Sequence, residues 1–133
     1  MALMKQIHVA AAVITDGTRV LATRRNYGEF AGGYEFPGGK LEPGESGEEA
    51  IHREIREELK AEIAVDRLLG TVAYDYPNFH LTMDCYLCRL LDRHITLTVH
   101  DCAKWLHPDE FDTVNWLPAD LEAVAWAKEA LHA

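Results

Sequence analysis

A glutamate-rich segment behind two adjacent glycines constrains this chain more than any other feature. It begins at Gly38 and reads GGKLEPGESGEEAIHREIREELKAEI. Ser46, with Glu49 three residues later, matches a capping box, which predicts that a helix begins there. Apolar residues then recur at helical spacing, at Ile51, Ile55 and Leu59. The segment therefore predicts a glycine-rich turn followed by a helix with one apolar face and many carboxylates.

Three of these carboxylates have a spacing that brings them together. Glu54, Glu57 and Glu58 stand at i, i+3 and i+4, so they converge on one side of the helix. One interpretation is a solvated acidic strip, which is the common fate of such charge. The other is a site for a hard divalent cation, because Mg²⁺ is held by a few carboxylates together with water and substrate phosphates.

The residues around the helix favour the cation site. Gly38 and Gly39 allow the backbone to approach a ligand or metal closely. Glu45 lies eight residues before Arg53, so an ion pair between them would tie the turn to the helix. The glycines, this pair and the three carboxylates form one constellation of fixed spacing.

This constellation resembles the Nudix box, G-x5-E-x7-R-E-U-x-E-E-x-G-U, in which U is a bulky aliphatic residue. Seven positions match in order, namely Gly39, Glu45, Arg53, Glu54, Ile55, Glu57 and Glu58. Lys60 stands where the pattern has Gly, and Ala61 where it has an aliphatic residue. Both departures lie at the end of the helix, so they concern the exit turn and not the ligands. A match at seven ordered positions is a specific signal.

The resemblance is closest to the MutT-like branch of the Nudix family and covers most of the chain. Further similar stretches are Ala22–Arg25, Tyr34–Lys40, Tyr74–Leu81 and Trp116–Asp120. The resemblance implies an α+β Nudix fold, an α/β/α sandwich around a mixed β-sheet. It also implies Mg²⁺-dependent hydrolysis of a nucleoside triphosphate to a nucleoside monophosphate and pyrophosphate, with Mn²⁺ as an alternative ion.

The same resemblance assigns roles to residues of the box. It implies that the metal ligands are the carbonyl of Gly38 and the carboxylates of Glu54, Glu57 and Glu58. Glu54 is our first candidate for the general base, and Glu57 is the second. A structural role is expected for Gly39, Glu45 and Arg53.

One loop departs from this branch of the family. MutT-like relatives often have a further Glu in the pattern E-H-x4-W, and the corresponding stretch here is VHDCAKW, ending at Trp105. Val99 takes the place of that Glu, and it can neither ligate a metal nor accept a proton. Asp101 or His100 could substitute for it after a small loop shift, although a lone polar residue in a loop is more often simply solvated.

Several residues are candidates for substrate binding. Arg24 lies near the glycine loop and could contact phosphate or base edges, or could be an ordinary surface arginine. Phe36, Tyr76 and Phe79 could stack on a base, or could belong to the core.

Asp120 aligns with the residue that reads the base in MutT-like proteins, which is an Asn in the oxidised-guanine enzyme. An ionised Asp only accepts hydrogen bonds, so an exocyclic amine such as cytosine N4 is its natural partner. This favours cytidine nucleotides or a modified base. The alternative is that Asp120 merely caps the last helix.

Length and charge narrow the remaining choices. The 133 residues suffice for a single domain, 1–133, and the formal net charge is −9. An acidic chain is poorly suited to bind duplex nucleic acid, whereas a bridging cation still permits binding of small polyphosphates.

No signal peptide or membrane-spanning stretch is visible, and the number of cysteines is odd, so we expect a cytoplasmic protein without membrane association. The pattern C-x-x-C at Cys85 and Cys88 lies in a predicted strand, where residues three apart face opposite sides, so we interpret it as chance. Nothing in the sequence specifies an oligomeric state.

Elsewhere the sequence predicts strands and one more helix. A hairpin is expected from 8–15 and 18–23, a loop over 26–34, further strands over 68–76, 79–91 and 95–99, and a helical turn over 108–111. A last helix is expected from about Asp120, with an inner face of Leu121, Val124, Ala127 and Leu131.

Three functions remain open. The first is a pyrophosphohydrolase of cytidine or modified-base triphosphates. The second is an 8-oxo-dGTP diphosphatase that serves mutation avoidance. The third is a nucleotide-sensing Nudix module that has lost catalysis.

Overall fold

The part of the chain that the structure describes forms two β-sheets, two α-helices and two short 3-10 turns. The computed structural model describes residues 4–132. The strands are β1 (Lys5–Ile14), β2 (Val20–Arg25), β3 (Tyr34–Glu35), β4 (Gly38–Lys40), β5 (Ile63–Tyr76), β6 (Phe79–Leu90) and β7 (His100–Leu106). The helices are α1 (Gly47–Leu59), the 3-10 turns η1 (Pro108–Thr113) and η2 (Pro118–Asp120), and α2 (Leu121–His132). None of the helices in this described part of the chain has the length and apolar character needed to cross a membrane.

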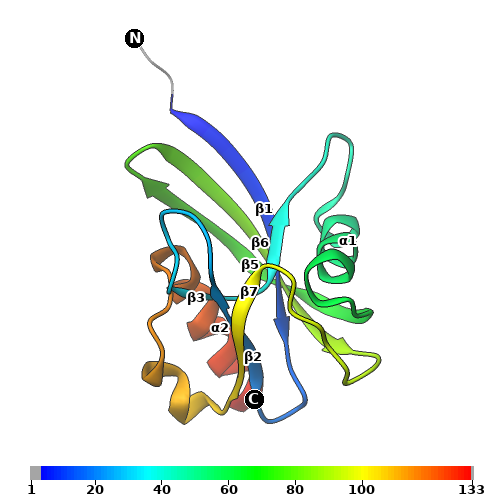
Figure 1. Ribbon diagram of the computed structural model, residues 1–133. Helices are drawn as coiled ribbons and strands as arrows, with labels where there is room; N and C mark the ends of the chain where they lie inside the picture. Colours follow the sequence, from blue (N-terminus) through cyan, green and yellow to red (C-terminus); the bar gives the residue numbers. More distant parts are fainter. Residues whose placement is uncertain (1–3, 133) are drawn as a thin grey trace.

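The larger sheet is mixed and has the order β4-β1-β6-β5 (Figure 1). β1 runs parallel to β6, while its pairing with β4 and the pairing of β5 with β6 are antiparallel. The smaller sheet, β3-β2-β7, is antiparallel. The predicted hairpin of β1 and β2 is therefore wrong. The two strands meet only at one bridge, between Thr15 and Val20, and then diverge into separate sheets.

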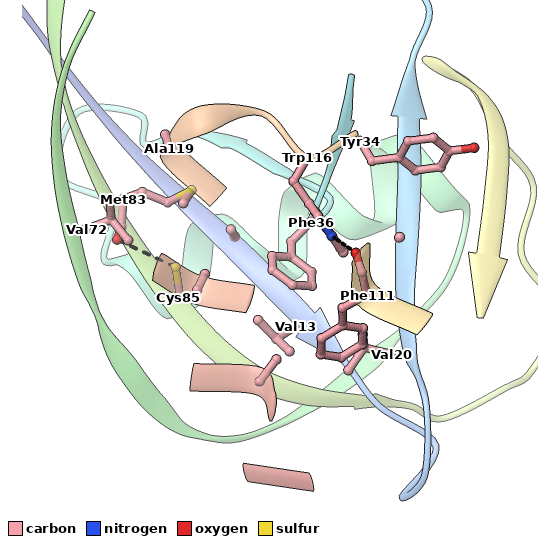
Figure 2. Packing of buried hydrophobic residues seen from close by; sticks show 14 of the residues in the cluster. Val13, Val20, Tyr34, Phe36, Val72, Met83, Cys85, Phe111, Trp116 and Ala119 are labelled. Atoms are coloured by element: carbon pink, nitrogen blue, oxygen red, sulfur yellow. Dashed lines mark hydrogen bonds between the residues drawn. The ribbon is translucent and has the colours of Figure 1, made fainter. Parts of the chain in front are cut away.

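The two helices cover opposite faces of the large sheet, which confirms the predicted α+β sandwich. One core packs α1 against β1, through residues such as Ile51, Ile55 and Ala12. The other core lies on the α2 side, and Figure 2 shows Phe36, Phe111 and Trp116 within it. The side chains of Cys85 and Cys88 are divided between these two cores, as expected for residues three apart on a strand.

Helix α1 begins as predicted and ends in a strained turn. The Ser46 hydroxyl accepts a hydrogen bond from the Glu49 N–H, and the Glu49 carboxylate accepts one from the Ser46 N–H. At the other end Lys60 adopts the left-handed conformation, with φ of 53° and ψ of 41°. This is the conformation for which glycine is preferred at helix ends, so the Gly of the family pattern has a direct physical reason.

The segment 95–99 is not a strand, contrary to the sequence prediction. Its backbone turns toward the end of α1, where the last carbonyls of a helix lack partners. The N–H groups of Thr96 and Thr98 donate to the carbonyls of Leu59 and Glu58, at 2.8 and 3.1 Å. Strand β7 begins only at His100.

Helix α2 packs mainly through small residues, and the predicted Val124 and Leu131 are partly buried against the same core. Ala123 and Ala127 are fully buried, whereas Leu121 is 57% exposed, so the predicted inner face is wrong at its first position. On β5, a side chain at Gly70 would clash with the ring of Trp126. Small residues on both sides allow the helix to approach the sheet closely.

Candidate active site

A pocket of about 540 Å³ lies between the large sheet, α1 and the segment that precedes α2. Its charged lining residues are Arg25, Glu35, Lys40, Glu54, Glu58 and Asp120. Of the residues predicted for the site, those that line it are Phe36, Gly38, Gly39, Glu54, Glu58, Tyr76, Phe79 and Asp120. Arg24 and Glu57 lie outside this lining.

The Glu45–Arg53 ion pair forms as predicted. The guanidinium of Arg53 donates from Nε and Nη2 to the two carboxylate oxygens of Glu45, both at 2.8 Å. Its Nη2 also donates to the carbonyl of Lys40 at 2.9 Å. The hydrogen bonds from Arg53 lower the pKa of Glu45 to about 2. Arg53 thus joins the turn, the end of β4 and the helix.

Glu54 and Glu58 face the glycine turn. Gly39 packs so closely that a Cβ there would lie 2.5 Å from the Oε2 of Glu54. The N–H of Gly38 donates to the Oε1 of Glu58 at 2.9 Å. Burial, together with the nearby charges of Glu54 and Glu35, raises the pKa of Glu58 to about 8. The glycines therefore bring backbone and carboxylates together, as predicted.

Glu57 lies on the exposed side of this pair. Its side chain is 60% exposed and contacts the Nη1 of Arg53 at 3.5 Å, while the same nitrogen donates to Glu54 at 2.7 Å. Within residues 4–132, no three His, Cys, Asp or Glu side chains lie close enough to hold a metal ion by themselves. The carboxylates still fit a hard cation, because Mg²⁺ completes its shell with water and substrate phosphates.

The pocket lining also includes aromatic residues and Asp120. Phe36 is buried against Trp116, with ring centroids 4.8 Å apart, and Phe79 lies 5.0 Å from Tyr76. Each of Phe36, Tyr76 and Phe79 therefore lines the pocket and also packs against the core.

Asp120 is buried and links distant parts of the chain. Its Oδ2 accepts a hydrogen bond from the backbone N–H of Phe36 at 3.0 Å, across 84 positions of sequence. No bond from its side chain to α2 appears among the described residues, so the structure does not support the helix-cap alternative. Burial raises the pKa of Asp120 to about 7.

The candidates Arg24 and Asp101 lie on strands β2 and β7, outside the pocket lining. Arg24 donates from Nε to the Oδ1 of Asp101 at 2.7 Å, and both side chains are substantially exposed. Val99 has no polar group to offer, as expected, and it precedes β7. The structure therefore does not bring Arg24 or Asp101 together with the carboxylates of α1.

Arg25, and not Arg24, is the arginine of this stretch that lines the pocket. Successive residues of a strand face opposite sides, so only one member of the Arg24-Arg25 pair can point inward. Its guanidinium pairs with Glu35, whose side chain is 11% exposed. The sequence prediction missed both residues. Which side chains of β2 point into the pocket depends on how β2 pairs with β7, and the sequence does not show that pairing. The adjacency of Glu35 to Phe36 was the available signal.

The fold and the pocket together define a small α+β protein whose acidic helix and glycine turn border a nucleotide-sized pocket. Residues 4–132 match the NUDIX domain. The chain therefore belongs to the Nudix hydrolase family, whose members generally require a divalent metal.

Similar proteins and structures agree with this membership. An 8-oxo-dGTP diphosphatase of Proteus vulgaris is 42% identical over 85 residues, which cover 62% of this chain and 76% of that protein. The CTP pyrophosphohydrolase of Escherichia coli is 34% identical over 131 residues, which cover 89% of this chain and 88% of that protein. The solution structure of the E. coli ORF135 protein superposes with a TM-score of 0.80 at 31% identity, and covers 100% of this chain and 96% of that one.

Proposed function

We propose that this protein hydrolyses nucleoside triphosphates to a nucleoside monophosphate and pyrophosphate, and that cytidine or modified-base nucleotides are its substrates. The observation that carries the proposal is the composition of one pocket. Its lining combines the carboxylates of Glu54 and Glu58 with aromatic rings and Asp120. This arrangement suits a ligand with a polyphosphate at one end and a base at the other.

The phosphate end would hold Mg²⁺ or Mn²⁺ between substrate oxygens and the carboxylates of Glu54, Glu57 and Glu58, with the Gly38 carbonyl as a further ligand. A bound divalent cation supplies charge neutralisation and a more acidic water. Glu54 is our candidate for the general base, since it lines the pocket while Glu57 is more exposed. Arg25, which also lines the pocket, would neutralise phosphate charge.

The base end would be read by Asp120 together with the rings of Phe36 and Phe79. The Oδ2 of Asp120 already accepts a bond from the protein backbone. Its Oδ1 makes no hydrogen bond among the described residues, and Asp120 lines the pocket, so Oδ1 is the oxygen that would accept from a ligand there. An acceptor at this position favours a base with an exocyclic amine.

A panel of triphosphates with product identification tests the proposal. We expect Mg²⁺-dependent release of pyrophosphate and nucleoside monophosphate, with cytidine nucleotides or their modified forms hydrolysed fastest. Asp120→Asn should shift the ranking away from cytidine, because an amide NH2 takes the place of one carboxyl oxygen; an unchanged ranking would show that Asp120 does not read the base. Binding without turnover on any canonical or oxidised triphosphate would instead identify the sensing module.

The second candidate is an 8-oxo-dGTP diphosphatase. The observation that favours it is the 42% identity to the Proteus vulgaris protein of that name, although over 62% of this chain. In the same panel, a preference for 8-oxo-dGTP over every cytidine nucleotide would decide for this candidate.

We also propose that residues 1–133 act as one domain in the cytoplasm, without a stable complex with nucleic acid or membrane. The three cysteines are free thiols in the structure, which supports a reducing compartment. The net charge of −9 supports the absence of broad nucleic-acid binding.

A further inference from the structure

A cluster of three largely buried polar residues forms part of one wall of the pocket and extends behind it. Arg25 donates from Nη2 to the Oε1 of Glu35 at 2.6 Å and from Nε to its Oε2 at 3.3 Å. His100, on β7, contacts the same Oε2 through its Nε2 at 3.1 Å. The three side chains come from three neighbouring strands of the small sheet.

His100 is fully enclosed, since the exposed fraction of its side chain is 0%. A carboxylate oxygen only accepts hydrogen bonds, so Nε2 must carry the hydrogen that points to Glu35. The other ring nitrogen, Nδ1, is buried and has no hydrogen-bond partner among the described residues.

An imidazole is a costly group for merely filling this space. A buried polar atom without a partner costs about 1–3 kcal/mol, and an apolar side chain of similar size would avoid that cost. The contact that an apolar side chain could not replace is therefore the hydrogen bond from Nε2 of His100 to Glu35.

Glu35 in turn determines where the charge of Arg25 lies. Both of its oxygens are occupied by Arg25, in the two-point geometry that orients a guanidinium. The guanidinium of Arg25 also lies over the rings of Tyr27 and Phe30, with its central carbon 5.1 and 6.0 Å from the two ring centroids. Arg25 and Glu35 both line the pocket, whereas His100 does not.

We propose that His100 is a positioning residue: its Nε2–H holds the carboxylate of Glu35, and Glu35 holds the Arg25 guanidinium in the orientation in which it meets the anionic part of the substrate. The inference rests on the proposed hydrolase function for its kinetic consequences. Its structural content, the dependence of Arg25 on His100, does not.

Two substitutions of similar polarity separate this role from simple packing. The amide nitrogen of Gln reaches about as far as Nε2, whereas the shorter Asn places its amide near the position of Nδ1. We expect His100→Gln to keep kcat/KM within about threefold of wild type. We expect His100→Asn to lower it by roughly tenfold or more, mostly through KM, because a displaced contact group weakens both binding and orientation. Lys104→Asn, an exposed change on the same strand, is the control.

A double-mutant cycle with Arg25→Lys tests whether His100 acts through Arg25. If it does, His100→Asn should cause little further loss in the Arg25→Lys background. If the double variant instead lost kcat/KM by the product of the two single losses, the proposal would be overturned. Equal effects of His100→Gln and His100→Asn on kcat/KM would also overturn it. Thermal unfolding of each variant identifies any that fails to fold.

An NMR measurement tests the same dependence without turnover. The side-chain Nε–H signal of Arg25, assigned by its loss in Arg25→Lys, should be similar in wild type and His100→Gln and displaced in His100→Asn. An unchanged signal in folded His100→Asn would overturn the positioning role. If wild type hydrolyses no triphosphate, the proposed function fails while this measurement still decides the role of His100.

Discussion

Four glutamates of one short stretch differ in their environments. Glu45 is bound at both oxygens by Arg53, and Glu58 is buried against the N–H of Gly38. Glu54 contacts both Arg53 and the surface of Gly39, while Glu57 is largely exposed. Identical side chains thus have separate tasks because the backbone around each one differs.

The metal assignment is tested at the residue scale by Glu57→Gln. The amide keeps the size of the side chain but removes the charge that a divalent cation requires, so kcat/KM should fall by about 100-fold or more. The far-ultraviolet spectrum and unfolding midpoint should hardly change, because this side chain is exposed.

Glu62→Gln is the matched control for Glu57→Gln. Glu62 is also exposed and pairs with Arg56, away from the pocket lining. The turnover of the Glu62→Gln variant should remain close to that of wild type. Near-normal turnover in Glu57→Gln would remove Glu57 from the ligand set.

At the scale of elements, α1 is defined by its two ends. A capping box begins it, and the segment 95–99 covers its last carbonyls. Between these ends, Ile51, Ile55 and Leu59 are fully buried against β1. The helix therefore has a fixed position, and its carboxylates face the glycine turn because of it.

Lys60, which follows the last residue of α1, has a strained left-handed backbone conformation that a substitution by glycine would relieve. A non-glycine residue in the left-handed region costs about 1–2 kcal/mol, and part of any gain from glycine is lost to the unfolded chain. Lys60→Gly should therefore raise the free energy of unfolding by about 0.5–1 kcal/mol in urea denaturation. Lys60→Ala, which keeps the Cβ, should give no such gain; an equal gain in both variants would show that the backbone conformation is not the cause.

The Glu45–Arg53 ion pair, which ties the glycine turn to α1, should make the stability of the protein depend on pH in the acidic range. Arg53 lowers the pKa of Glu45 from its ordinary 4.5 to about 2, so the folded state favours the ionised form. The stabilisation is present above about pH 4.5 and is lost as the pH falls toward 2. The difference in melting temperature between wild type and Glu45→Gln should be constant near neutrality and should narrow across this window.

Glu42→Gln provides the comparison for the tether. Its carboxylate is more exposed and lies 3.5 Å from the Nε of Arg53. Its melting temperature should stay near that of wild type throughout. A difference between wild type and Glu45→Gln that did not change between pH 5 and pH 2.5 would contradict the ion-pair explanation.

On the scale of the whole molecule, two cores share the strands of the large sheet. The pocket forms where the second core opens, so its aromatic residues are core residues with one accessible side. Asp120 closes this arrangement by joining the segment before α2 to the backbone of Phe36. The pocket therefore depends on contacts between chain segments that are far apart in sequence.

Asp120→Asn should reveal the cost of burying this charge. The pKa of Asp120 is raised from 3.8 to about 7, so the folded state favours the protonated form. The stability that protonated Asp120 allows the folded state is fully present below pH 3.8 and is lost as the pH rises through 7. Asn still accepts from the Phe36 N–H and does not ionise. The variant should gain stability relative to wild type between pH 4 and 8, by roughly 2–4 kcal/mol.

Urea denaturation at several pH values measures this difference for Asp120→Asn. Asp66→Asn, an exposed change on β5, should show no comparable pH-dependent gain. A difference between Asp120→Asn and wild type that is independent of pH would show that Asp120 is not buried as a titrating group.

The sequence by itself determined what is encoded locally. The capping box of α1, its apolar stripe and the Glu45–Arg53 pair depend on spacing along one helix and one turn, and each was confirmed. The α+β sandwich was also predicted, because the family pattern implies it.

Only the tertiary structure decided which strands pair and which residues share the pocket. β1 and β2 separate into two sheets, the segment 95–99 covers the end of α1, and Arg25 turns inward while Arg24 pairs with Asp101. The contact of Asp120 with Phe36 spans 84 positions. Local spacing carries no record of such partners, because the facing of a strand and the environment of a buried charge are set by residues distant in the chain.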